Sequence, residues 1–427
     1  MTDVRAFRAL RYDPARADLD RVVVPPYDVI APDERAVYWD RDPHNAIRLE
    51  LTRDAADEAS TDYREVAQTL AAWQHEGALL RDARPALYAL RQRFSAPDGS
   101  EQVRDGFFAL LHLEDYERRI VRPHERTLSG PKADRLKLLR ATGANLSSVF
   151  LLYEDPQRAL NALLAAKLDA GPAAVAHDAA GVEHRLVPVT AADAIDAVRG
   201  FLADRPVVIA DGHHRYETAL AYRDEQRARA GGDAKDAAFE FTLAYFANAY
   251  APGTLLLPIH RVVREVPAPD DASWAARLPG WSQQHVALPG VDAVPALLER
   301  HLAPLADRHA FAADDGSGVL RIFSRARAAG DDLSIRVLHA EVLHGVFGLD
   351  DAALRDGAVA FPKHAPEAAR DVRSGRGSVA LYLNPLAAED VFRVTAAGEI
   401  LPQKSTFFYP KLPSGLVFRL LDGRDFA

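Results

Sequence analysis

Five consecutive residues, Asp211-Gly212-His213-His214-Arg215, bring together a carboxylate, a glycine, two imidazoles and a guanidinium. The preceding run 206–210 is apolar and β-branched, which predicts a buried strand. Residues 214–229 are rich in helix formers and contain neither Gly nor Pro, which predicts a helix. Because Gly212 permits a backbone conformation barred to other residues, the strand can turn tightly into the helix. The free N–H groups and the dipole at the start of such a helix favour a phosphate or another anion.

The side chains of this turn suit a nucleotide. Arg215 can hold phosphate oxygens through two hydrogen bonds, and His213 and His214 can donate hydrogen bonds or relay protons near neutral pH. We expect Asp211, at the end of the strand, to bind a hydrated Mg²⁺ that bridges a carboxylate and phosphates. A zinc site is a weaker alternative, because adjacent histidines on a helix diverge by about 100°. The plainest alternative is that Asp211 only caps the helix and the histidines only pack.

A basic segment lies elsewhere in an acidic chain of net charge −9. Residues 118–140 contain eight Arg or Lys residues and only two acids, Glu125 and Asp134. Such a segment is either a local anion site or a solvated helix face. Within it, Arg122, Arg126, Lys132 and Arg135 could neutralise phosphate charge.

These motifs resemble known families. Asp211 to Arg215 resembles the signature of the ParB/sulfiredoxin-like nucleotide-binding fold, most closely its version in the archaeal free serine kinases. The chain is also similar, over nearly its full length, to the mostly bacterial DUF1015 family. The segments that carry this similarity are 25–28, 122–145, 210–220 and 404–415.

The resemblance to the kinases implies roles for further residues. In Pro123-His124-Glu125, Glu125 would be the catalytic carboxylate that accepts the proton of an attacking alcohol, with Asp211 and His213 beside it. Gly212, His214, Arg215, His124, Arg126, Lys132 and Arg135 would bind the nucleotide or its phosphates. Lys404, Ser405 and Thr406 would contact the amino acid or phosphate, with Lys411 and Ser414 as weaker candidates.

The resemblance also implies a division of the chain. Strands and helices alternate irregularly, so we expect an α/β (α+β) fold with a ParB/sulfiredoxin-like core and additional N-terminal and C-terminal lobes. The expected regions are 1–104, a core at 105–265 with an insertion or extra lobe near 154–204, and 266–427, whose tail 401–415 returns to the active site. The pattern predicts helices near 63–77 and 134–142, and strands at 87–94, 106–113 and 149–153.

Composition excludes several classes of function. The absence of Cys excludes disulfides, iron–sulfur clusters and cysteine nucleophiles. Residues 1–20 lack an apolar segment and no apolar run approaches membrane length, so we expect a cytoplasmic protein without a signal peptide or membrane partner. Net acidity argues against nucleic-acid binding.

We therefore expect a phosphotransferase that moves phosphate from ATP or ADP, with Mg²⁺, to a small hydroxyl compound. Free serine is the first guess, and a homodimer is one option. The alternative is a ParB-like module that binds or hydrolyses a nucleotide and regulates a partner, and a general base such as Glu125 distinguishes the two.

Overall fold

The computed structural model describes residues 1–53, 61–125, 129–231, 234, 236–328, 330–402 and 404–426. The chain divides into two compact units. The first comprises Met1–Leu255, Val394–Ile400 and Pro410–Ala427, and the second comprises Leu256–Arg393 and Leu401–Tyr409. In the described ranges, no helix is long and apolar enough to cross a membrane.

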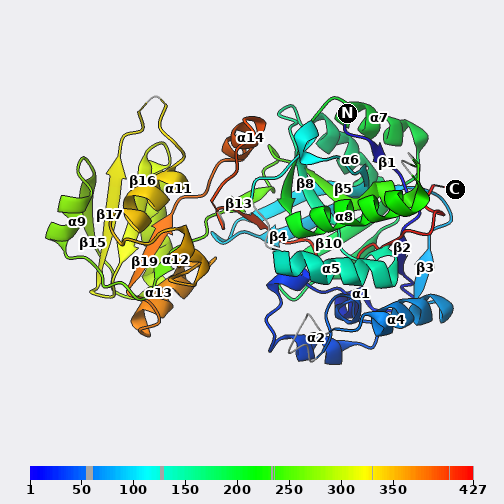
Figure 1. Ribbon diagram of the computed structural model, residues 1–427, viewed down its shortest axis with the longest axis horizontal. Coiled ribbons are helices and arrows are strands. Elements are labelled where there is room, and N and C mark those ends of the chain that lie inside the picture. Colours follow the sequence, from blue (N-terminus) through cyan, green and yellow to red (C-terminus); the bar gives the residue numbers. More distant parts are fainter. Residues whose placement is uncertain are drawn as a thin grey trace. The chain divides into compact units, whose positions relative to one another are not determined.

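A mixed sheet forms the centre of the first unit (Figure 1). Among the residues that the structure describes, it has nine strands in the order β6-β11-β8-β12-β5-β4-β10-β9, with β1 paired to β5. Their bounds are β1 Val4–Arg5, β4 Leu87–Ser95, β5 Glu101–His112, β6 Val121–Arg122, β8 Val149–Tyr153, β9 Ala174–His177, β10 Glu183–Val189, β11 Val207–Asp211 and β12 Phe241–Asn248. Two small sheets pair β2 (Leu10–Tyr12) with β3 (Leu79–Arg81) and β7 (Ala144–Asn145) with β21 (Arg419–Leu420).

Helices surround this sheet. They are α1 Leu19–Val22, α2 Arg35–Arg41, α3 Ile47–Glu50, α4 Arg64–His75, α5 Ser129–Thr142, α6 Ala159–Ala170, α7 Ala192–Leu202 and α8 His213–Ala230. Short 3₁₀ turns lie at Tyr27–Val29, Tyr116–Arg118 and Ala238–Glu240. Helix α5 packs against α8 (Figure 1). On α4, Val66, Leu70 and Trp73 are buried at helical spacing, which explains why this segment folds against the unit.

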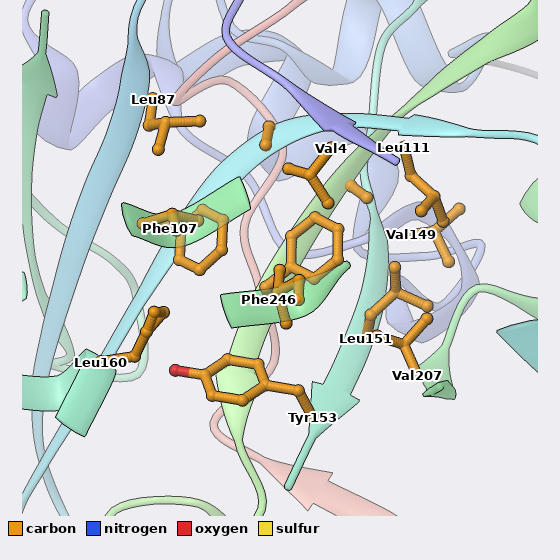
Figure 2. Close-up of a cluster of buried hydrophobic side chains, with 14 of the residues drawn as sticks. Val4, Leu87, Phe107, Leu111, Val149, Leu151, Tyr153, Leu160, Val207 and Phe246 are labelled. Carbon is orange, nitrogen blue, oxygen red and sulfur yellow. The ribbon is translucent and has the colours of Figure 1, made fainter. Parts of the chain in front are cut away.

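The main core lies on the face of the sheet that α6 and α7 cover. Phe107 and Leu111 of β5 point to this face because alternate strand residues share one side. Figure 2 shows Phe107 and Phe246 at its centre, where their rings stack at 5.1 Å. Leu160 and Leu164, one turn apart on α6, complete the contact. A second cluster joins α3, α4 and β2 to Phe418 in the C-terminal segment.

The second unit is built on its own antiparallel sheet. In the described part of this unit, six strands run in the order β15-β17-β16-β19-β14-β18. They are β14 Arg261–Val263, β15 Ser282–Ala287, β16 His309–Asp314, β17 Val319–Arg325, β18 Val359–Ala360 and β19 Val379–Leu383, and β13 (Leu255–Leu257) pairs separately with β20 (Phe407–Tyr409). Its helices are α9 Asp271–Arg277, α10 Val294–His301, α11 Ser334–Val337, a π-helix at Leu338–His344, α12 Asp351–Arg355, α13 Ala365–Arg373 and the start of α14 (Ala388–Ala396). Two 3₁₀ turns, Val291–Ala293 and Ala303–Leu305, flank α10.

The structure confirms the mixed α+β class and most of the expected elements. The helix expected at 63–77 is α4, and the strands expected at 87–94 and 149–153 are β4 and β8. The region 154–204 is not a separate lobe: β10 pairs with β4 over seven residues and extends the main sheet. A boundary at residue 104 would cut through β5, so residues 1–104 and most of 105–265 share one unit.

Candidate functional site

The Asp211 turn has the predicted strand–turn–helix geometry. Strand β11 ends at Asp211, Gly212 adopts φ +88°, and α8 begins at His213. The register of β11 against β8 shifts between Ile209 and Asp211, and such bulges often re-aim a side chain beside a functional site. A Cβ at Gly212 would lie 2.9 Å from Nε of Arg215, because that side chain folds back across the turn. The backbone angle therefore requires glycine, and any other residue would also have to move the Arg215 side chain.

Two cations hold the Asp211 carboxylate. Lys411 donates from Nζ to Oδ1 at 2.6 Å, and Arg215 donates from Nη2 to Oδ2 at 2.6 Å. Arg215 also donates to the backbone oxygen of Ser148. Burial by itself would raise the pKa of Asp211, but the charges of Lys411 and Arg215 outweigh it and hold that pKa well below its usual range. Asp211 is therefore an anionic anchor for two cations at the start of α8.

This arrangement fits poorly with Asp211 as a Mg²⁺ ligand, because each carboxylate oxygen already accepts a hydrogen bond from a cation. In the part of the chain that the structure describes, no group of three or more His, Asp or Glu side chains could hold a metal ion. Mg²⁺ usually binds through one or two carboxylates together with substrate phosphates. A metal at Asp211 would have to share these oxygens with Lys411 and Arg215 or displace one of the two cations.

The Pro-His-Glu segment lies against this turn. The backbone N–H of His124 donates to Nε2 of His213 at 3.3 Å, and the two rings meet edge to face at 4.7 Å. Nδ1 of His124 donates to the backbone oxygen of Ile209. Nε2 of His124 lies 3.5 Å from Oε1 of Glu125, whose side chain is 23% exposed. The structure thus brings together a partly accessible carboxylate and the start of α8, although they are far apart in sequence.

His213 is neutral at physiological pH. Burial, aided by the nearby His124, lowers the pKa of His213 to about 3, against the opposing charges of Glu125 and Asp211. Its Nε2 is the acceptor in the contact with His124, so its proton is on Nδ1. A neutral imidazole here can donate or accept a hydrogen bond, but it carries no positive charge to pair with a phosphate.

Two of the other predicted phosphate ligands, Lys132 and Arg135, form ion pairs with acidic side chains of the protein. Lys132 pairs with Glu217 at 2.8 Å, at a partly exposed position on α5. Arg135 is buried and donates to Asp134 and Glu50. Although burial opposes it, the charges of Glu50 and Asp134 raise the pKa of Arg135. His214 is half-buried on α8, and Arg126 lies outside the described residues.

Sequence reasoning missed the part that the N-terminal segment takes in this site. The Tyr27 ring lies 4.4 Å from Cζ of Arg135, and the negative charge of Asp28 favours the charged form of Arg215. Burial raises the pKa of Tyr27 to about 12, with Arg215 opposing the shift. Ser414 donates to Oε1 of Glu50 at 3.0 Å, which joins the C-terminal segment to the same polar network. Segment 25–28 carries part of the similarity to the family, but no local sequence pattern says what it packs against.

The remaining candidates have structural partners or belong to the second unit. Residues 410–415 of the expected returning tail belong to the first unit, whereas 401–409 belong to the second. There, Lys404 is exposed with φ +57°, Ser405 donates to the backbone of Pro402, and Thr406 is half-buried. The substrate-binding role of Lys404, Ser405 and Thr406 stays a prediction.

Comparison with known proteins places the chain in a family. Residues 4–299 match the family described as "Protein of unknown function (DUF1015)", and the chain belongs to that family. No curated protein matches it in sequence. A solved structure of a conserved hypothetical protein from Pyrococcus furiosus is 12% identical, with a TM-score of 0.34, and the match covers 74% of this chain and 96% of that one.

Two other solved structures are similar at the same level. A free serine kinase mutant in complex with ADP is 10% identical, with a TM-score of 0.34, and the match covers 70% of this chain and 87% of that one. A C-terminally truncated SbnI from Staphylococcus aureus is 10% identical, with a TM-score of 0.32, covering 71% and 86% of the two chains.

Proposed function

We propose that the first unit is a nucleotide-dependent kinase that transfers a phosphoryl group from ATP or ADP to the hydroxyl of a free amino acid, with serine the first candidate. The observation that carries this proposal is the meeting of Pro123-His124-Glu125 with the Asp211 turn through His124 and His213. A kinase for an alcohol needs an anion site and a proton acceptor in one place. The start of α8 with Arg215 supplies the first, and Glu125 supplies the second.

The charges of these groups assign each of them a role in the proposed reaction. The free N–H groups at the start of α8 and the cations Arg215 and Lys411 stabilise the negative phosphates. Asp211 keeps those two cations in place. As the alcohol oxygen forms its bond to phosphorus, the bond from phosphorus to the leaving nucleotide oxygen breaks, and the alcohol proton passes to the Glu125 carboxylate. His124, buried and bonded to Ile209, positions Glu125.

The alternative function is a nucleotide-binding or nucleotide-hydrolysing regulatory module. It requires the same anion site but no proton acceptor for a small alcohol. Glu125, with a partly exposed side chain beside His124, favours the kinase.

One assay tests the proposal directly. The pure protein is incubated with Mg²⁺, ATP or ADP, and pools of amino acids and other metabolites, and products are identified by mass spectrometry. We expect a phosphorylated hydroxy amino acid that depends on Glu125. Tight nucleotide binding without any phosphorylated acceptor would favour the regulatory module instead.

A further inference from the structure

The second unit contains a pocket of about 180 Å³ at one end of its sheet. It lies where β17 and β19 end and where β16 and β14 begin. The pairings His309 with Arg325, and Phe311 with Leu383, bring these antiparallel ends to the same edge. The strand order β17-β16-β19-β14 therefore sets which residues lie beside one another around the pocket.

One side of the pocket is cationic. Arg308 precedes β16 and Arg327 follows β17, the neighbouring strand. The Arg308 guanidinium makes no hydrogen bond or ion pair with any residue that the structure describes. Only the backbone of Arg308 is bonded: its N–H donates to the backbone of Leu305, and its oxygen accepts from Ser334. Arg327 donates from Nη2 to the Ser334 hydroxyl at 2.9 Å and to the backbone of Ala306 at 3.1 Å. An uncommitted guanidinium beside a second one is suited to a carboxylate or phosphate.

The other side supplies acceptors. Asn384 and Asp390 follow β19, the strand on the far side of β16 from Arg327. Asn384 donates from its amide nitrogen to the backbone of Leu302 at 2.9 Å, so its amide oxygen remains an acceptor. Asp390 accepts one hydrogen bond, from Arg393 at 2.7 Å, and a carboxylate can accept several. These two acceptors suit an ammonium group.

Apart from Ser405, whose hydroxyl donates to the backbone of Pro402, the remaining wall is apolar. Ile259, Ile335, Leu383 and Leu386 line the pocket. A cavity of about 150 Å³ holds a molecule the size of benzene, so this pocket takes a ligand of roughly six to nine non-hydrogen atoms. A short aliphatic group would occupy the apolar wall while its polar ends met the charges.

We propose that this pocket binds a free aliphatic α-amino acid as the zwitterion. Its carboxylate pairs with Arg308 and Arg327, its ammonium group with Asp390 and the Asn384 amide oxygen, and its side chain lies on the apolar wall. The pocket belongs to the second unit, and this proposal does not depend on the kinase proposal.

Calorimetry on the full-length protein tests the ligand class. The probes are L-valine, isovalerate (valine without its amino group), isobutylamine (valine without its carboxylate) and inorganic phosphate. We expect L-valine to bind at least about tenfold more tightly than either analogue, because each analogue lacks one charged hydrogen-bonding group. Binding of phosphate alone, equal binding of isovalerate and L-valine, or no binding of L-valine would overturn the proposal.

Substitutions test the geometry. Arg308→Gln should weaken L-valine and isovalerate by at least about tenfold. Asp390→Asn should weaken L-valine but leave isovalerate unchanged, so this variant distinguishes the two ends of the pocket. Arg300→Gln, at an exposed position on α10 outside the pocket, is the matched control and should bind like the wild type.

Glu125→Gln and Arg215→Ala should also retain L-valine binding, which separates this proposal from the kinase. Unchanged L-valine affinity in a folded Arg308→Gln variant would overturn the proposal that the pocket binds an amino acid. If Arg308→Gln does not fold, as judged by its melting transition, Asp390→Asn is the deciding variant. The assignment of the two ends of the pocket is contradicted if Asp390→Asn loses affinity for both isovalerate and L-valine, or for neither.

Discussion

Lys411 donates from Nζ to Oδ1 of Asp211 at 2.6 Å, although the two residues are 200 positions apart in the sequence. The segment that carries Lys411 is held firmly: buried Arg104 donates to the backbone of Pro410 at 2.6 Å, and Ser414 donates to Glu50. A residue near the C-terminal end thus completes the charge arrangement at the start of α8. Because Lys411 binds Oδ1 and Arg215 binds Oδ2, the loss of either cation leaves one oxygen of Asp211 without that partner.

Arg215→Ala should weaken nucleotide binding by about 1.5–3 kcal/mol, the range for hydrogen bonds to charged groups. The loss removes a guanidinium at the start of α8 and releases one oxygen of Asp211. Calorimetric titration with ATP and ADP measures the effect. Arg140→Ala is the matched control, because the ion pair between Arg140 on α5 and Glu225 on α8 is partly exposed and contributes little. Equal nucleotide affinity in folded Arg215→Ala and Arg140→Ala would remove Arg215 from the site.

The low pKa of His213 predicts a pH-dependent stability. Between about pH 6.5, the value for an unfolded chain, and about pH 3, where His213 titrates in the folded protein, the unfolded chain binds a proton that the folded chain does not. Acidification through this range therefore favours unfolding, and stability is regained as the pH rises.

We expect His213→Asn to remove this contribution. Between pH 6 and pH 5, the free energy of unfolding of the wild type should fall more steeply than that of the variant, by up to about 1.4 kcal/mol per pH unit. Urea unfolding at several pH values measures the two slopes, and His75→Asn, at an exposed position on α4, is the control. Parallel slopes for wild type and His213→Asn would mean that His213 is protonated in the folded protein.

Asp211→Asn distinguishes an anchor from a metal ligand. If Asp211 mainly holds Lys411 and Arg215, the variant should lose nucleotide affinity by a similar factor with and without Mg²⁺. If Asp211 binds the metal, as its place at the end of the strand first indicated, the loss should appear only with Mg²⁺ present. Titration with ADP, without Mg²⁺ and at saturating Mg²⁺, gives the loss of affinity under each condition. We expect a similar loss of nucleotide affinity under both conditions, because both carboxylate oxygens are bound to cations.

Local features of this site were predictable from the sequence, and distant contacts were not. The β-branched run before Asp211, the glycine and the helix formers after it specify the strand, turn and helix by short-range rules. The contacts of Lys411 with Asp211 and of Tyr27 with Arg135 depend on how the chain returns after hundreds of residues, and no periodicity encodes that. The same holds for β10, whose pairing with β4 is a long-range property of the sheet.

Glu125→Gln is the variant that separates the two proposed functions. It keeps the shape of the side chain and removes the proton acceptor. Nucleotide affinity should be unchanged or slightly higher, because Arg215 and the start of α8 hold the phosphates and a negative charge nearby has been removed. Phosphoserine formation should fall by about 10²–10⁴-fold, the usual contribution of a positioned acid or base. Glu117→Gln, in the 3₁₀ turn before this segment, is the matched control and should keep full activity. If Glu125→Gln is as active as the wild type on a confirmed acceptor, another group takes the proton; if the wild type phosphorylates no acceptor yet binds nucleotide tightly, the regulatory module becomes the better description of the first unit.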